Sequence, residues 1–227
     1  MYTTVNIIDI SEQFFDKRAM ESSATESGWR GSPELWLGAA YEALLESGID
    51  AVKILPLAKK LGLSRTSFYW FFKDREELLA ALVTQWRDKN TGNLVKQTEA
   101  YAETIAEAML NVIDCWLDDT IFDSKFEFAV RSWALQSADI AAEVRAADRQ
   151  RLDALTRMFV RFGQDETQAD VRARTTYLTQ IGYISMQTEE DIAVRMERIP
   201  EYVEIFTGQA PEQNELDRLH ARYDTRG

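Results

Sequence analysis

Residues 52–79 read VKILPLAKKLGLSRTSFYWFFKDREELL, a basic segment in an acidic chain. From Lys53 to Arg75 the segment contains six lysine or arginine residues and a single aspartate, so it carries a net charge of +5. The whole chain of 227 residues has a formal charge of −12, which leaves −17 for the remainder. Proteins bind a nucleic-acid duplex mainly by neutralising its phosphates and releasing their counterions. This segregation of charge therefore favours a nucleic-acid-binding face.

The first half of the segment has the spacing of a short amphipathic helix. Apolar side chains recur at i, i+3, i+4 and i+7, namely at Ile54, Leu57, Ala58 and Leu61. Pro56 lacks a backbone N–H and is tolerated only in a first helical turn, so the helix is expected to start close to Lys53. Gly62 readily adopts the left-handed conformation that ends many helices, which predicts the helix end.

A second short helix is predicted directly after the first. Ser64 is a good N-cap, and we expect a helix from Arg65 to about Phe71. Leu63 is expected to fill the core from the turn. Two short helices joined by Gly-Leu-Ser are typical of a helix-turn-helix, whose second helix enters the major groove with its first residues nearest the base edges.

Four short motifs stand in this region: Gly62-Leu63-Ser64, Phe68-Tyr69, Phe72-Lys73 and Glu76-Glu77-Leu78-Leu79. In combination they resemble the DNA-binding signature of the TetR family of transcriptional regulators, over about residues 34–82. The resemblance implies an all-α fold in which a three-helix helix-turn-helix DNA-binding domain precedes a larger helical ligand-binding and dimerisation domain. It also implies double-stranded DNA, a second copy of the chain and a small ligand as partners.

The resemblance assigns roles to individual positions. Arg65 and Ser67 would face bases, and Tyr69 and Lys73 would bind phosphate. Thr66 and Trp70 would make either kind of contact. The full set of predicted DNA-binding residues is Lys53, Arg65, Thr66, Ser67, Tyr69, Trp70 and Lys73. Two of these depart from the family pattern, because Thr66 replaces a small residue and Lys53 replaces Thr or Ser. The aromatic residues Phe68, Phe71 and Phe72 are expected in the core instead.

We expect three parts along the chain: an N-terminal arm and linker at 1–31, the helix-turn-helix domain at 32–80, and the helical ligand-binding and dimerisation domain at 81–227. Ser32 and Pro33 predict the start of a first helix that Gly48 ends. No later stretch has the alternation typical of strands. Further helices are predicted at about 75–90, 100–118, 124–136, 138–162, 167–187, 189–198 and 211–223. Capping boxes are predicted at Thr167-x-x-Asp170 and Thr188-x-x-Asp191, and breaks at Gly163, Pro200 and Gly208.

The composition argues against an enzyme. Cys115 and His220 are the single cysteine and histidine of the chain, so a Cys/His zinc cluster and a disulfide are impossible within one chain. No glycine-rich phosphate loop is present. We therefore expect no catalytic residues, no metal site and no cofactor. No apolar run is long enough to span a bilayer, and we expect a cytoplasmic protein that makes no membrane contact.

Aromatic and methionine side chains in the second half serve mainly as core, but a fraction of them is expected to line an apolar ligand cavity among helices 100–162. The candidates are Met109, Trp116, Phe122, Phe126, Trp133, Met158 and Phe162. By the resemblance, the dimer face is expected within residues 138–187. Tyr177, Ile181, Ile184 and Ser185 recur at near-helical spacing there, which fits either a dimer interface or the core of one chain.

The leading hypothesis is a sequence-specific, DNA-binding transcriptional regulator: a ligand-responsive repressor that acts as a homodimer on a palindromic operator. The alternative is a constitutive or architectural DNA-binding protein that has no small-molecule inducer. An enzyme on an all-helical scaffold is the third and weakest hypothesis.

Overall fold

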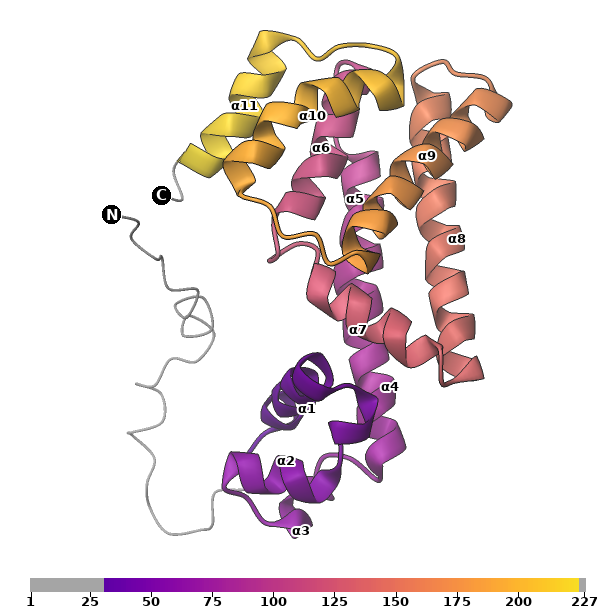
Figure 1. Cartoon of the computed structure of the whole chain (residues 1–227). Coiled ribbons are helices and arrows are strands. Elements are labelled where there is room, and N and C mark those ends of the chain that lie inside the picture. Colours follow the sequence, from indigo (N-terminus) through magenta and orange to yellow (C-terminus); the bar gives the residue numbers. More distant parts are fainter. Residues whose placement is uncertain (1–30, 225–227) are drawn as a thin grey trace.

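The computed structural model describes residues 31–224, and within them the regular secondary structure is all helical, which confirms the predicted fold class (Figure 1). Of the predicted N-terminal arm and linker, residues 1–30 lie outside the described part. The helices are α1 (Pro33–Ser47), η3 (Ile49–Ala51), α2 (Ile54–Leu61), α3 (Arg65–Phe68), α4 (Arg75–Trp86), η4 (Arg87–Gly92), α5 (Asn93–Glu99), α6 (Ile105–Leu117), α7 (Ser124–Ala134), α8 (Ala138–Arg161), α9 (Glu166–Ser185), α10 (Ile192–Thr207) and α11 (Gln213–Asp224).

The predicted capping residues of the helix-turn-helix are confirmed. The Ser32 hydroxyl accepts from the backbone N–H of Leu35 at the start of α1, and Gly48 follows the end of this helix. Gly62 ends α2 with a φ of 65°, in the left-handed region that glycine adopts without a steric penalty. Ser64 caps α3 by accepting from the backbone N–H of Ser67.

The predicted extent of α3 to Phe71 is wrong, because the helix ends at Phe68. After this residue two backbone bonds are of the tighter i to i+3 kind, from Trp70 N to the Ser67 carbonyl and from Phe71 N to the Phe68 carbonyl, and Phe72 N also donates to the Phe68 carbonyl. The tighter turns bring Phe72 onto Phe68, where the two rings stack with centroids 5.5 Å apart. The packing of Phe72 on Phe68 thus accompanies the early end of the helix.

The helix predicted at 75–90 is part of a longer helical rod. It consists of α4, a π-helical segment η4 and α5, and the sequence analysis missed both α5 and the change of helix type. Asn90 and Thr91 of η4 are buried and bonded to side chains of the larger domain, which fixes the wider turn. The following helix therefore starts only at Ile105, capped by Thr104, and not near residue 100.

Three predicted signals in the C-terminal part are wrong. Asp165 caps α9 and Asp191 caps α10, so neither Thr167 nor Thr188 begins a capping box. Pro200 lies inside α10 and does not end it. The flanking Ile199 and Val203 are buried, so packing on both sides of the proline holds the helix together despite the lost backbone hydrogen bond. Gly208 does end α10, as predicted.

The small N-terminal domain packs directly on α7, which crosses between it and the larger domain (Figure 1). The Tyr41 hydroxyl donates to a carboxylate oxygen of Asp123 at 2.6 Å. The Tyr41 and Phe126 rings meet edge to face with centroids 5.0 Å apart. One apolar core therefore spans the helix-turn-helix and α7. No helix in residues 31–224 is long and apolar enough to cross a membrane.

Candidate nucleic-acid interface and ligand cavity

The helix-turn-helix forms the end of the molecule that lies opposite α10 and α11 (Figure 1). Arg65 and Thr66, at the start of α3, are exposed. Tyr69 and Trp70, just beyond the helix, expose 46% and 62% of their surface. Lys53 and Lys73 are exposed as well. Six of the seven predicted DNA-binding residues are therefore accessible to a partner.

Arg65 is held by its neighbour one helical turn away. A guanidinium nitrogen of Arg65 donates to the Tyr69 hydroxyl at 2.9 Å, and the guanidinium carbon lies 5.7 Å from the centre of the Tyr69 ring. This contact reduces the conformational freedom of a long side chain and leaves further N–H donors for another acceptor. The arrangement presents an oriented cation at the start of α3.

Ser67 does not belong to this exposed set. Only 5% of its surface is accessible, and its hydroxyl donates to the Ser64 carbonyl at 2.7 Å. Its backbone N–H is bonded to the Ser64 hydroxyl, so both of its donors stabilise the start of α3. The predicted base-facing role of Ser67 does not fit this position, because a base edge has no access to the hydroxyl.

Two of the six basic residues in the segment serve the fold itself. Lys60 lies 2.8 Å from a carboxylate oxygen of Glu42, and this hydrogen bond raises the pKa of Lys60. Arg75 donates from Nε to the Val52 carbonyl at 2.6 Å and from Nη2 to the Ile49 carbonyl at 3.0 Å. The basic side chains that remain exposed without such contacts are Lys53, Lys59, Arg65 and Lys73.

Lys73 is placed by the start of α4. Asp74 caps this helix by accepting from the Glu77 backbone N–H at 2.9 Å, and the Glu77 carboxylate accepts from the Lys73 backbone N–H at 2.6 Å. These reciprocal bonds fix the backbone at Lys73 and leave its ammonium group pointing into solvent. Asp74 and Glu77 therefore fix the backbone that carries Lys73.

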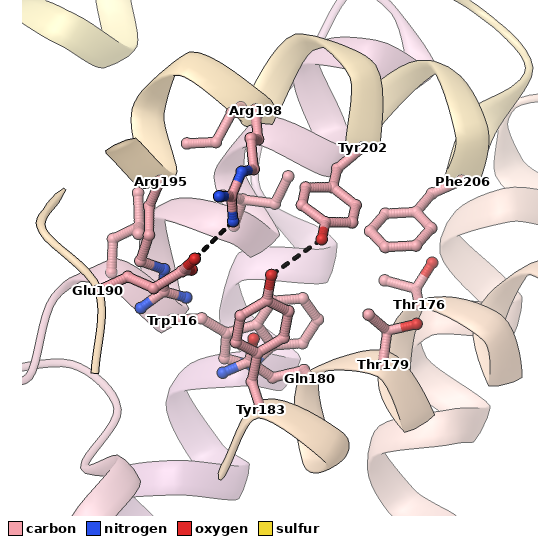
Figure 2. A pocket seen from close by; sticks show the side chains of 13 residues that line it. Trp116, Thr176, Thr179, Gln180, Tyr183, Glu190, Arg195, Arg198, Tyr202 and Phe206 are labelled. Atoms are coloured by element: carbon pink, nitrogen blue, oxygen red, sulfur yellow. Dashed lines mark hydrogen bonds and ion pairs between the residues drawn. The ribbon is translucent and has the colours of Figure 1, made fainter. Parts of the chain in front are cut away.

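A hollow of about 520 Å³, counting its open mouth, lies between α6, α9 and α10 (Figure 2). Aromatic residues of these helices line it, and apolar side chains of α6 and α10 complete the wall. Its polar lining includes Glu190, Arg195 and Arg198 at one end, where Glu190 and Arg198 form an ion pair. The hydroxyls of Tyr183 and Tyr202 meet at 2.8 Å across the hollow.

Of the seven residues predicted to line a cavity, Trp116 lines this hollow and the other six do not. Met109, Phe122 and Met158 are buried in the core of the larger domain, and Phe162 packs on its edge. Two more are buried in the core shared with the helix-turn-helix, namely Phe126 and Trp133. Trp133 also lines a separate hollow beside α1. The seven residues as a ligand-binding set stay a prediction, because large apolar side chains that line a cavity and those that fill a core have the same pattern in the sequence.

The sequence analysis also missed the α10 side of the hollow. Its aromatic contribution, Tyr202 and Phe206, stands at the i, i+4 spacing that places both on one helix face. Arg195 and Arg198 precede them at compatible spacing. The sequence contains this spacing, but the helix break expected at Pro200 placed the two arginines and the two aromatic residues on separate segments.

The apolar stripe of α9, formed by Tyr177, Ile181, Ile184 and Ser185, fits either a dimer interface or the core of one chain by sequence, and burial distinguishes the two. Tyr177 and Ile184 are buried in the core of their own chain, and Ile181 is partly buried beside them. A different face of α9 is exposed, with Val171 at 57% and Leu178 at 60% accessibility. The intrachain reading is therefore correct for the buried residues of the stripe.

A buried charge network lies where η4, α7, α8 and α9 meet, and the sequence analysis did not predict it. Glu127 and Arg151 are both fully buried and share two hydrogen bonds, of 2.7 and 3.0 Å. The Glu127 carboxylate also accepts from the Trp86 indole N–H at 2.7 Å and from Arg131 Nε at 2.9 Å. Burial alone would raise the pKa of Glu127, but Arg151, Arg131 and the Asn90 amide outweigh it and lower the pKa to about 2.

Comparison with known proteins now adds to this geometry. Residues 37–82 match the family model of bacterial regulatory proteins, tetR family, which confirms the resemblance carried by the four motifs. No curated protein matches the chain by sequence. Among solved structures, the chain is similar to the fatty acid degradation regulator FadR from Bacillus halodurans, at 14% identity and a TM-score of 0.59, over 81% of this chain and 97% of that one. It is also similar to a transcriptional regulator from Rhodococcus sp. Rha1, at 20% identity and a TM-score of 0.53, over 83% and 96% of the two chains.

Proposed function

The chain is a DNA-binding transcriptional regulator with the tetR-family domain at residues 37–82, and we propose that it is a ligand-responsive repressor acting as a homodimer on a palindromic operator. In this proposal residues 32–80 read the DNA, and residues 81–227 bind the ligand and the second copy. The observation that carries it is the exposed set on and around α3, with an oriented arginine at the helix start and lysines on either side.

The proposed contacts divide into two kinds. Arg65 and Thr66 stand at the N-terminal end of α3, which in a helix-turn-helix lies nearest the base edges. Lys53, Tyr69 and Lys73 surround this end and supply a charge or a hydroxyl for phosphate oxygens. Trp70 is exposed beside them and is assigned to either kind of contact. Ser67 is left out, because it is buried.

A homodimer is supported by the exposed apolar side chains of α8 and α9. Val171 and Leu178, together with Thr175, lie at i, i+4 and i+7 on one face of α9, and Val160 of α8 is 42% exposed. Such a patch on an otherwise charged chain is typical of a surface that another protein covers. We call the helix-turn-helix domain, residues 32–80, the reading head. Two reading heads joined in this way would contact successive major grooves about 34–36 Å apart.

Ligand response is supported by the path from the hollow to the reading head. α4 runs from the helix-turn-helix into η4, whose Thr91 hydroxyl accepts from Arg151 Nε at 2.9 Å. Arg151 in turn donates to the Tyr177 hydroxyl at 3.0 Å, on the helix that forms one wall of the hollow. A ligand that binds one arrangement of these helices better by a few kcal/mol would shift the dimer away from the spacing that DNA requires.

Selection of bound sequences from a random duplex pool tests the function, followed by affinity measurements at several salt concentrations. An enriched, roughly palindromic motif is expected for the wild-type chain. Uniform binding without a motif would instead establish the architectural alternative. Absence of any DNA binding would overturn the proposal.

Lys73→Ala tests the phosphate contacts with this selected duplex. We expect weaker binding to all sequences and a salt slope shallower by about one unit, because one phosphate contact is lost. Lys96→Ala is the matched control, since this lysine is exposed on α5, away from the reading head. Equal effects of the two substitutions would show that the effect comes from total charge and not from a contact.

A further inference from the structure

The hollow between α6, α9 and α10 contains polar atoms that the fold leaves unsatisfied. Among the described residues, the indole N–H of Trp116, the hydroxyl of Thr176 and one carboxylate oxygen of Glu190 belong to residues that line the hollow, are buried and have no hydrogen-bond partner. Trp116 is 5% exposed and Thr176 is fully buried. Buried polar groups nearly always have partners, because an unmade hydrogen bond costs about 1–3 kcal/mol. Such groups around one hollow, on α6, on α9 and just before α10, are typical of a site that is completed by a ligand.

The charged end of the hollow contains an arginine that no carboxylate neutralises. Glu190 forms its ion pair with Arg198, whereas Arg195 has no acidic partner within 4.0 Å in residues 31–224. The Arg195 guanidinium instead lies over the Tyr183 ring, 5.6 Å from its centre (Figure 2). Glu190, Arg195 and Arg198 at this end sum to +1, which favours an anion over a cation. Arg195 also borders a neighbouring hollow that Asp119, Lys125 and Glu189 line.

The remaining walls favour a ligand that has a flat, apolar part. Tyr183, Tyr202 and Phe206 form consecutive ring contacts, with Tyr202 stacked on Phe206 at 5.6 Å between centroids. Ile113 and Ile199 add aliphatic surface. The hollow has a cavity volume of about 50 Å³ and reaches about 520 Å³ only when space open to solvent is counted. A ligand of one ring with a short side chain would therefore also fill the open mouth of the hollow.

We propose that this hollow binds a small aromatic carboxylate: Arg195 pairs with the carboxylate, the aromatic side chains enclose the ring, and the Trp116 N–H bonds to an oxygen on the ring. The inference rests on the proposed ligand response, for which it specifies the chemical class of the ligand. A neutral ring lacks a partner for Arg195, and an aliphatic acid lacks the ring that Tyr202 and Phe206 stack on. An aromatic cation would meet the positive charge of Arg195.

Calorimetric titration of the full chain without DNA tests the site with four probes. These are 4-hydroxyphenylacetate, its neutral amide, the amine tyramine and the aliphatic acid hexanoate. We expect 4-hydroxyphenylacetate to bind at least about tenfold more tightly than each of the others, because a charge-assisted hydrogen bond is typically worth a factor of ten or more. No binding of 4-hydroxyphenylacetate, or equal binding of the amide or hexanoate, overturns the proposal.

Arg195→Gln tests the assigned cation. The variant should bind 4-hydroxyphenylacetate about tenfold more weakly and bind the amide as before, so that the preference for charge disappears. Arg174→Gln is the matched control, because this arginine is exposed on α9, pairs with Asp170 and does not line the hollow. If Arg195→Gln keeps the full preference for the acid, the assignment is wrong.

Trp116→Phe tests the unsatisfied indole. It retains an aromatic ring but removes the N–H, so the affinity for 4-hydroxyphenylacetate should fall while that for phenylacetate, which has no ring hydroxyl, stays the same. Equal losses for both acids would refute the hydrogen bond to the ring oxygen. Thermal unfolding of each variant shows whether the fold is retained.

These titrations are independent of DNA, so they distinguish two kinds of failure. If the acid binds but does not change the affinity for the selected operator, the binding site stands and the proposed ligand response fails. If operator binding is confirmed and the acid does not bind, the regulator stands and the proposed ligand class fails.

Discussion

At the scale of the residue, Arg65 is already oriented for the base contact that the proposed function assigns to it. Its hydrogen bond and ring contact with Tyr69 keep the guanidinium near the start of α3. An arginine that is already oriented loses less conformational entropy when it binds the edge of a base. Tyr69 thus has a second proposed role besides phosphate binding, as the residue that positions Arg65.

Arg65→Ala is expected to cost about 1–3 kcal/mol in binding to the selected operator and to relax the preference at one base position. Repeating the sequence selection with the variant measures both effects. Tyr69→Phe retains the ring but removes the hydroxyl that accepts from Arg65, so it should weaken the same base preference less severely. An unchanged motif for Arg65→Ala would mean that this residue does not read a base.

At the scale of the element, the π-helical segment η4 joins the reading head to the larger domain through buried polar contacts. The Asn90 amide donates to the Glu127 carboxylate and to the Asp123 carbonyl, each at 3.0 Å, and its oxygen accepts from the Asp123 backbone N–H at 2.9 Å. Directional bonds of this kind have few alternative arrangements, whereas apolar packing slides more readily. Movement of α7 or α8 would therefore be transmitted to α4.

The Glu127–Arg151 pair predicts a specific acid sensitivity. The pKa of Glu127 is lowered from an ordinary 4.5 to about 2, so the folded state favours the ionised carboxylate. The resulting stabilisation, roughly 3 kcal/mol, is complete above pH 4.5 and is lost as the pH falls from 4.5 towards 2.

Urea unfolding at a series of pH values measures this loss. Glu127→Gln should be destabilised by about 3–5 kcal/mol at neutral pH, because it leaves Arg151 charged and buried, and its stability should vary less between pH 4.5 and 2. Glu143→Gln, a change at the partly exposed partner of Arg87, serves as the control. If wild type and Glu127→Gln lose stability in parallel across this range, Glu127 is not the titrating group.

At the scale of the whole molecule, the reading head and the exposed α9 face lie on different parts of the chain. α2 and α3 form one end of the molecule, and α8 and α9 lie along the side of the larger domain (Figure 1). A contact between two copies through α8 and α9 would leave both reading heads uncovered. Paired binding to DNA is then compatible with dimerisation.

Light scattering at micromolar concentration is expected to give a dimer. Leu178→Glu should shift the chain towards monomer, because a carboxylate would be buried in the apolar contact, and it should also weaken binding to the palindromic operator. Leu135→Glu alters another exposed leucine, outside the α9 face, and should leave the dimer intact. A wild-type monomer, or dissociation by both substitutions alike, would refute an interface at α9.

The sequence by itself determined the local features of this protein. Ser32 and Gly48 mark the two ends of α1, Gly62 marks the end of α2 and Ser64 marks the start of α3, because capping depends mainly on neighbouring residues. The four motifs likewise predicted the tetR-family domain, which the family model matches at residues 37–82. The tertiary structure decided what depends on distant residues: the burial of Ser67, the early end of α3, the passage of α10 through Pro200 and the sorting of aromatic side chains into core or cavity. The Glu127–Arg151 pair belongs to the same class, since charged residues 24 positions apart become partners only when α7 and α8 pack together.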